Sequence, residues 1–325
     1  MKKTYPSSED MDKWRESLDL STFFPAGQDR DKALYAAASY RDAPYRLVVG
    51  DGFRCCEYRL FLNIFTFGKA SFRLPFTIIG PPASVDQTGY YGSLEKLANH
   101  YKNKKGNFLV LNLDAPWDQW GTCARTLSTA VLVNKFKSVD DYMGALRSAY
   151  RRKIRLTKEK IAGLPWEQIP PERFDESLYR LYLQVLAKSD FPLERLAPDF
   201  FRTCPGKIFA LQEEGHPLAF VLLEHQEGKT TFLFGGMDYE KRDARDLYMN
   251  MLIKVVEEGI GNGAKEIHLG QTAEESKCRL GAVLVPRYML FLSSNRLMTG
   301  LARILMKHLA YSENIRPHHV FRDIS

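Results

Sequence analysis

One stretch of the chain, residues 204–285, constrains the fold most because its hydrophobic periodicity changes in a fixed order. Apolar, β-branched runs bounded by turns come first, a helical segment follows, and another apolar run closes the stretch. Strands are expected at residues 207–211, 217–224, 230–234 and 266–269, and a helix at 245–258. We expect the third strand to end at Gly235-Gly236, and Gly259, Gly261 and Gly263 to end the helix. This order predicts a unit of α+β structure.

The first half of the chain follows the same outline, without residue-level identity to the second. Strands are expected at residues 45–49, 53–67 and 72–79 as an antiparallel meander, then a helix at 94–102 and strands at 108–113 and 129–134. Ser138 has the spacing of a capping box and starts a predicted long helix. Gly163 and the prolines after it stop this helix. We therefore expect two domains, residues 1–162 and 163–325.

Composition narrows the class of protein further. The 325 residues carry a net charge of +7 with a pI near 9.0, which favours anionic partners. No run of eighteen apolar residues occurs, and the first residues lack the apolar core of a secretory signal, so we expect a cytoplasmic protein without a membrane-spanning segment. The five scattered cysteines form no Cys-x-x-Cys pair, which argues against a disulfide framework or a metal site.

Three segments resemble the FemAB-like branch of the GNAT acyltransferases. They are the basic run Tyr-Arg-Arg-Lys-Ile-Arg at 150–155, the Gly-Gly-Met-Asp sequence at 235–238, and residues 268–282 with their Lys-x-x-x-Gly spacing from Lys277 to Gly281. The resemblance implies an α/β (α+β) fold of two tandem GNAT-like domains, each a mixed, largely antiparallel sheet flanked by helices. It also implies transfer of an acyl or aminoacyl group to an amine, with an acyl-thioester or an aminoacyl-tRNA as donor.

The chemistry implied by this resemblance needs a proton acceptor, hydrogen-bond donors for an oxyanion and an anchor for the donor's phosphates. For the proton transfers we predict Glu224, with His225 as an alternative on the opposite strand face, and Tyr288. Each of these residues also has a structural interpretation as a strand-end or packing residue.

Two further groups of residues are candidates for binding. The donor is expected against Gly235 and Gly236, with its phosphates near Arg242 and Arg245. The acceptor is expected near Gln271, Thr272 and Lys277. Asp246 and Tyr248 stand where the family's phosphate loop has small residues, so an exposed, charged helix start is the alternative there.

Two basic helices suggest partners. Arg147, Arg151 and Arg155 have the spacing of one helix face and predict contact with tRNA phosphates, a solvated helix flank being the alternative. Near the C-terminus, Leu297, Leu301 and Ile304 alternate with basic residues in an amphipathic helix. We expect this helix to close a sheet, with membrane contact as the alternative.

Three functions therefore compete. The first is N-acyl transfer from acyl-CoA, such as acetyl-CoA, to a small-molecule or peptidoglycan-precursor-like amine. The second is aminoacyl transfer from an aminoacyl-tRNA, and the third is non-catalytic binding on a GNAT-like fold. No metal is expected in any of them.

Overall fold

The computed structural model describes residues 8–24, 26–67, 70–117, 119–120, 122–189, 194–226, 228–312 and 315–322. The chain forms two compact units, and each is assembled from three segments of sequence. Unit 1 comprises residues 1–127, 193–200 and 286–313, and unit 2 comprises 128–192, 201–285 and 314–325. The contiguous division into 1–162 and 163–325 stays a prediction.

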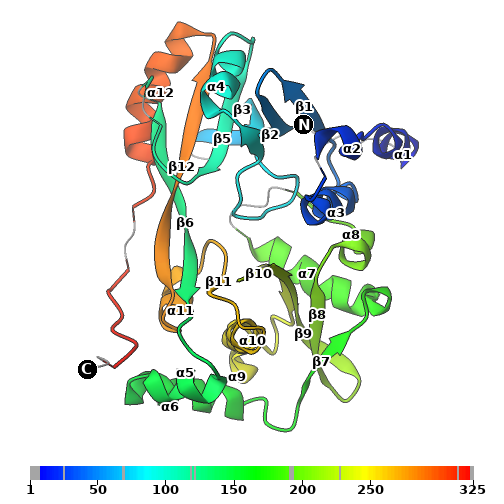
Figure 1. The fold of residues 1–325 in the computed structure, drawn as a ribbon, viewed down its shortest axis with the longest axis vertical. Helices are drawn as coiled ribbons and strands as arrows, with labels where there is room; N and C mark the ends of the chain where they lie inside the picture. Colours follow the sequence, from blue (N-terminus) through cyan, green and yellow to red (C-terminus); the bar gives the residue numbers. More distant parts are fainter. Residues whose placement is uncertain are drawn as a thin grey trace. The chain divides into compact units, whose positions relative to one another are not determined.

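Unit 1 contains the predicted meander, preceded by the helices α1 (Ser8–Glu16), α2 (Leu20–Phe23) and α3 (Asp29–Ala38) (Figure 1). The antiparallel strands are β1 (Tyr45–Gly50), β2 (Phe53–Phe67) and β3 (Ala70–Ile79), and the short β4 (Tyr90–Gly92) pairs with β2. Ser93 caps helix α4 (Leu94–Lys102) by accepting a hydrogen bond from the backbone amide of Lys96. After α4, strand β5 (Asn107–Leu113) pairs in parallel with β3.

Unit 2 repeats this plan. Its meander consists of β8 (Lys207–Glu213), β9 (His216–Gln226) and β10 (Lys229–Met237), with the short β7 (Trp166–Ile169) paired to β8. Helices α9 (Arg242–Arg245) and α10 (Leu247–Gly261) follow, and β11 (Glu266–His268) pairs in parallel with β10. Unit 2 also contains α7 (Glu176–Lys188) and the 3-10 turn Pro171–Arg173, and α8 (Pro198–Thr203) begins in unit 1 and ends in unit 2. The predicted order of antiparallel strands, helix and strand is confirmed in both halves.

Two long strands explain why the units are discontinuous in sequence. Strand β6 (Cys123–Val133) begins in unit 1, but from Ser128 it belongs to unit 2, where Val131 lies opposite His268 of β11. Strand β12 (Val283–Ser293) begins in unit 2, but from Pro286 it belongs to unit 1, where Leu290 lies opposite Val110 of β5. Strand β6, which follows α4 and β5 of unit 1 in the sequence, therefore completes the sheet of unit 2. Strand β12, which follows α10 and β11 of unit 2, completes the sheet of unit 1.

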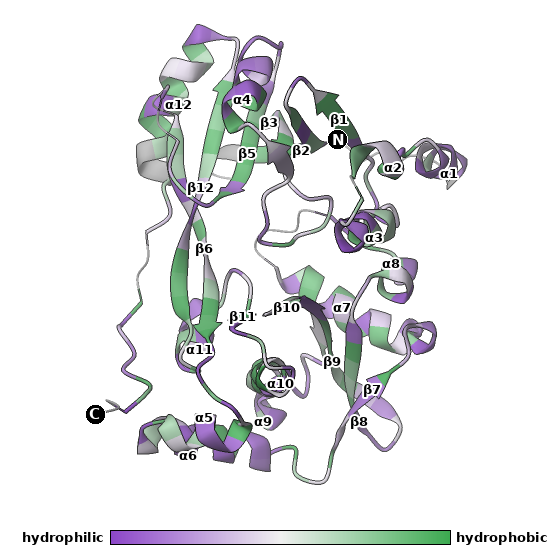
Figure 2. Ribbon diagram, in the orientation of Figure 1, coloured by the Kyte–Doolittle hydropathy of each residue, from purple (hydrophilic) through white to green (hydrophobic). Residues whose placement is uncertain are grey.

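Helices cover both faces of the unit 2 sheet. Helix α10 is largely apolar, whereas helix α6 (Ser148–Glu159) is mostly hydrophilic (Figure 2). Leu247, Met251 and Val255 of α10 are buried in the core of the unit. Gly259 lets the helix approach the sheet closely, because a Cβ there would lie 2.6 Å from the Ile267 side chain of β11. Helix α7 packs on the other face of β10, where its backbone lies close to Gly236.

The predicted long helix after Ser138 is wrong in one respect, because the chain forms two helices there. Helix α5 (Val139–Ala145) ends before Leu146, and α6 begins after Arg147, whose backbone is extended. The cause is distant in sequence, since Leu146 forms a β-bridge with Phe321 near the C-terminus. The Arg147 amide also donates to the carbonyl of Val320. A backbone that bonds to another segment at this point cannot continue the helical hydrogen-bond pattern.

Candidate functional site

The feature that organises unit 2 is the divergence of its two parallel strands. Strand β10 pairs with β11 only from Lys229 to Thr231, and a bulge in its pairing with β9 follows between Phe232 and Phe234. Beyond that point β10 stays with β9, while the chain after β11 stays with β6, where the Gly270 carbonyl accepts from the Ala130 amide. A strand pair that separates in this way creates a place where main-chain groups of both strands face a ligand rather than each other.

Gly235 and Gly236 lie inside β10 rather than beyond its end, which corrects the predicted strand boundary. The reason is that β9 continues to pair with them, placing Gly235 opposite Val221 and Gly236 opposite Phe220. A Cβ on Gly236 would lie 2.6 Å from the backbone nitrogen of Tyr182 in α7. A Cβ on Gly235 would lie 2.5 Å from the end of a methionine side chain in α10. Both glycines thus have a packing reason, and their contact with a donor stays a prediction.

The loop after β11 has an unusual backbone. Gly270, Thr272 and Ala273 all have positive φ values, of 77°, 62° and 47°. For the two residues with a side chain this conformation costs about 1–3 kcal/mol each, so surrounding contacts must hold it. One such contact comes from Lys277 of helix α11 (Glu274–Cys278), whose Nζ donates to the Gln271 carbonyl at 2.7 Å. The structure therefore brings together the three residues predicted to bind the acceptor.

Lys277 is almost fully buried, with 3% of its surface exposed. Burying an ammonium group is costly, so a buried lysine is a candidate for a functional site. Its helix is held by a distant segment as well, because Glu275 accepts from His318 at 3.0 Å, and Glu275 also accepts from Arg279 at the end of the same helix. The hydrogen bond from His318 and the neighbouring charges lower the pKa of Glu275. The loop and α11 thus form a fixed element beside the diverging strands.

Glu224 belongs to a buried polar row that crosses three strands. It lies opposite Thr231 of β10, and Thr231 lies opposite His268 of β11, so the three side chains share one face of the sheet. All three residues are at most 5% exposed. The His268 Nε2 atom is 3.0 Å from the carboxylate of Glu266. Burial, with a contribution from Glu224, raises the pKa of the Cys204 thiol.

Sequence reasoning missed Thr231 and His268 as neighbours of Glu224. Strand alternation had placed Glu224 and His225 on opposite faces, and the observed register agrees, because His225 lies opposite Thr230 with 2.9 Å between Nδ1 and Oγ1. The row itself depends on the register between strands, which no local pattern contains. The signal that was available is a polar residue at a core-facing position in each of three adjacent apolar strands.

Tyr288 lies in a different unit from Glu224. It is on the part of β12 that belongs to unit 1, opposite Leu113, and it is partly buried. Its catalytic role stays a prediction. Tyr248, at the start of α10, is partly buried against the core of unit 2, and desolvation raises the pKa of its hydroxyl group, which is typical of a packing residue.

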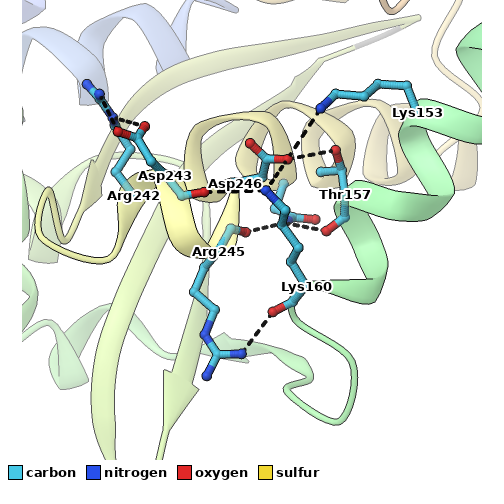
Figure 3. A network of polar contacts seen from close by, with 8 residues as sticks. Lys153, Thr157, Lys160, Arg242, Asp243, Arg245 and Asp246 are labelled. Carbon is cyan, nitrogen blue, oxygen red and sulfur yellow. Dashed lines mark hydrogen bonds and ion pairs between the residues drawn. The ribbon is translucent and has the colours of Figure 1, made fainter.

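Asp246 is the N-cap residue of α10 and pairs with Lys153 of the basic helix α6 and with Lys160, which directly follows that helix (Figure 3). Its carboxylate is 3.0 Å from the Nζ atom of Lys160 and 3.6 Å from that of Lys153, and it accepts from the Thr157 hydroxyl at 3.3 Å. Partial burial opposes ionisation, but the hydrogen bond from Lys160 and the two lysine charges outweigh it and lower the pKa of Asp246. The side chain of Asn250 adds a hydrogen bond to the Thr157 carbonyl. The N-cap residue of α10 is thus an anion that is paired with two lysines, and its carboxylate accepts no hydrogen bond from the backbone amides of the helix.

The two arginines predicted to bind phosphate also have partners within the chain. Arg242 pairs with Asp243 through two hydrogen bonds of 2.8 and 3.0 Å, which raise the pKa of Arg242. Arg245 pairs with Glu213 and donates to the Lys160 carbonyl at 3.0 Å. A phosphate at this position would have to displace these carboxylates.

The outer face of α6 differs from the face that holds Asp246. Arg151 and Arg155 are one helical turn apart, and their side chains make no hydrogen bond or ion pair within the described residues. The same is true of Arg152, which is exposed. Arg147 lies outside the helix, and its Nε donates to the Phe321 carbonyl at 3.0 Å, so the predicted row of three arginines is reduced to two.

In the part of the chain that the structure describes, no group of three metal-binding side chains lies close enough to hold a metal ion. Among the same residues, none of the helices has the length and apolar character needed to cross a membrane.

A meander, a crossover helix and a parallel strand that diverges from the meander define the class of fold, which is that of the GNAT-type acyltransferases. Comparison with solved structures agrees. The chain resembles the C-terminal DUF2156 domain of an Agrobacterium fabrum protein assigned as a lysylphosphatidylglycerol synthetase, with a TM-score of 0.53, 11% identity and coverage of 96% of this chain and 100% of that one. It also resembles L-PGS from Bacillus licheniformis, with a TM-score of 0.51, 11% identity and coverage of 95% and 98%.

A third structure, a conserved protein of unknown function from Bacteroides thetaiotaomicron, has a TM-score of 0.51 at 12% identity, with coverage of 89% of this chain and 98% of that one. No protein-family model matches the sequence, and comparison with curated proteins finds no match. At such low identity the similarity concerns the fold, and the predicted FemAB-like, GNAT-type fold is confirmed at that level.

Proposed function

We propose that the protein transfers an aminoacyl group from an aminoacyl-tRNA to an acceptor nucleophile. The observation that carries this proposal is the anionic N-cap residue of α10, which is paired with two lysines. In the resembled family this helix start binds the pyrophosphate of coenzyme A, whereas here Asp246, Lys153 and Lys160 neutralise one another at that position. The name of the Agrobacterium structure, which describes a lysyl group on a phospholipid, supports an aminoacyl group as the one transferred.

The charges on α6 support a nucleic-acid donor. Arg151, Arg152 and Arg155 have no anionic partner within the described chain, so their charges are available to phosphates. Arginine is well suited to this role because its planar guanidinium group binds phosphate oxygens in pairs. We therefore expect the donor's phosphates to bind at the outer face of α6, and not at the start of α10 as in the resembled family.

The proposed reaction is an acyl transfer in one displacement. The acceptor's amine or hydroxyl attacks the carbonyl carbon of the aminoacyl ester, forming a new amide or ester bond. The bond to the terminal ribose of the tRNA breaks, and the ribose oxygen takes up a proton as it leaves. We propose that Glu224 accepts the proton of the attacking group, and that Lys277, with Gln271 and Thr272, binds an anionic group of the acceptor.

The first test is tRNA binding measured over a range of salt concentrations. For the wild-type chain, the logarithm of the affinity should fall linearly with the logarithm of salt concentration. The double variant Arg151→Gln, Arg155→Gln should reduce this slope by about 1–2 and weaken binding at low salt by about tenfold. The matched control is Lys158→Gln, because Lys158 is already paired with Glu257 at 2.6 Å and should contribute little. Equal effects of the two changes would contradict the proposal.

The second test measures transfer. Bulk charged tRNA with labelled amino acids is incubated with phosphatidylglycerol or with a peptidoglycan-precursor amine, and label is followed in the acceptor. Transfer that depends on Glu224 and Lys277 supports the mechanism. Absence of transfer to both acceptors, with intact tRNA binding, would favour a non-catalytic binding protein.

Acyl-CoA remains the second candidate donor, because the divergence of β10 from β11 is the feature against which a thioester lies in the resembled family. Titration calorimetry with acetyl-CoA and longer acyl-CoAs decides between the two donors. Saturable binding of an acyl-CoA at low micromolar concentration, together with salt-independent tRNA binding, would overturn the aminoacyl-tRNA proposal.

A further inference from the structure

Helix α12 (Arg296–Leu309) of unit 1 exposes large apolar side chains along one face. Leu297 is 84% exposed, Ile304 is 62% exposed and Leu301 is 45% exposed. Their spacing of four and then three residues places them in one line on an α-helix. Gly300 lies between them, and a Cβ added there would meet no atom within 4 Å, so the surface along this line is open.

This line is distinct from the face that holds α12 in place. Met306 is buried, and the Asn295 side chain caps the helix by accepting from the amides of Leu297 and Met298. Thr299 anchors the first turn through a hydrogen bond to the Ser293 carbonyl. The helix is therefore ordered and attached without its exposed apolar line. Single exposed leucines are ordinary on protein surfaces, but three in a line on one helix are a patch that calls for a partner.

Basic and aromatic residues lie on one side of the line. Arg296 is exposed and makes no hydrogen bond or ion pair within the described residues. Arg303 is exposed as well and donates to the carbonyl of Trp120 at 3.0 Å. Lys102 lies over the Trp120 ring at 4.0 Å, and Trp117 packs edge-on against the same ring. An apolar line with cationic side chains and partly buried tryptophans beside it is the composition of helices that lie in a membrane interface.

We propose that α12 docks the protein on an anionic lipid bilayer, with its apolar line inserted among the headgroups and its arginines paired with lipid phosphates. The charge identifies the occupant. The chain carries +7 overall, and Arg296 and Arg303 lie beside the apolar line, so an anionic surface complements it whereas a second copy of the same basic face would be repelled. Docking of α12 on a bilayer requires only unit 1 and does not depend on the proposed aminoacyl transfer.

The experiment is co-sedimentation of the full-length chain with vesicles, without any donor. Vesicles of equal parts phosphatidylglycerol and phosphatidylcholine should bind the protein, and vesicles of phosphatidylcholine alone should bind it far more weakly. The double variant Leu297→Ser, Ile304→Ser should weaken binding by about 30- to 100-fold, because each side chain leaves the interface. Arg296→Gln should weaken it by about fivefold, and added salt should reduce this difference.

A matched control uses two exposed apolar residues elsewhere in unit 1. Val49 is 56% exposed and Phe61 is 61% exposed, so Val49→Ser, Phe61→Ser removes similar apolar surface from the strands β1 and β2. The proposal predicts unchanged vesicle binding for this control. Circular dichroism of both double variants should match wild type, since all four side chains are largely in solvent.

Three results would overturn the proposal. Equal binding by the α12 variant and wild type would show that the line does not contact lipid. Equal loss in the two double variants would show that general surface hydrophobicity governs binding. A concentration-dependent dimer that Leu297→Ser, Ile304→Ser abolishes, without vesicle binding by wild type, would show that the line covers a second copy of the chain.

Discussion

The close approach of α7 to β10 gives a prediction whose size follows from the coordinates. In Gly236→Ala, the new Cβ would lie 2.6 Å from the backbone nitrogen of Tyr182, 2.7 Å from the backbone carbon of Leu181 and 2.4 Å from the ring of Phe220. Ordinary contact for a Cβ begins near 3.4 Å. The Phe220 ring can rotate, but the helix backbone cannot yield locally, so α7 must retreat by roughly 0.8 Å, the difference between 3.4 and 2.6 Å.

That retreat loosens the buried face of α7. Leu178, Leu181 and Tyr182 are all buried against the sheet, and overpacking at such a site costs about 1–3 kcal/mol. Replacing glycine also restricts the unfolded chain, which offsets about 0.4–1 kcal/mol. We therefore expect Gly236→Ala to lower the free energy of unfolding by about 1–2 kcal/mol.

Urea denaturation followed by circular dichroism measures this change. The control is Gly144→Ala, because Gly144 is a helical residue of α5 whose added Cβ would meet nothing within 4 Å, and it should stabilise the protein by about 0.5–1 kcal/mol. Donor binding is measured on the same samples. If Gly236→Ala abolished donor binding without lowering stability, the glycine would serve the ligand rather than the helix, and the packing argument would be refuted.

Two further predictions concern charged residues of unit 2. Asp246→Asn should lower the free energy of unfolding at neutral pH by about 0.5–1.5 kcal/mol, because the partly exposed pairs with Lys153 and Lys160 are lost. The pKa of Asp246 is lowered in the folded state, so the stability difference between wild type and Asp246→Asn should be complete above the ordinary pKa of 3.8. It should vanish as the pH falls through the folded-state pKa. A stability difference that stays constant with pH would contradict the proposed pairing of Asp246 with the lysines. Lys277→Met should reduce transfer at least about tenfold. The control is Lys254→Met, because Lys254 is another largely buried lysine and pairs with Glu258. This control should leave transfer unchanged, and an equal loss of transfer in the two variants would refute a site role for Lys277.

The elements that sequence predicted well are those whose signals are local. Helix α4 has the predicted bounds because Ser93 caps it and its apolar positions recur at helical spacing. The meander of unit 1 was predicted from runs of β-branched and aromatic residues and from the turn between β1 and β2. The break before α6 escaped prediction because it is caused by pairing of Leu146 with Phe321, which lies 175 residues away by their numbers.

The candidate site divides in the same way. Gln271, Thr272 and Lys277 were found together because they are close in sequence, and the fold keeps them on one loop and helix. Thr231 and His268 were missed because only strand register brings them beside Glu224. The exchange of β6 and β12 between the units was equally hidden, because a strand's sequence does not state which sheet edge it will complete.

Asp246 shows how a departure from a family pattern can be informative. Its φ of 47° is a left-handed conformation in which glycine costs nothing and an aspartate costs about 1 kcal/mol, so the backbone alone would favour glycine. The carboxylate offsets this cost by pairing with Lys153 of α6 and with Lys160, the residue directly after that helix. The pairing fixes α6 on α10 and directs Arg151 and Arg155 to the opposite face of the helix. The residue that removes a phosphate site from α10 therefore also positions the arginines proposed to replace it.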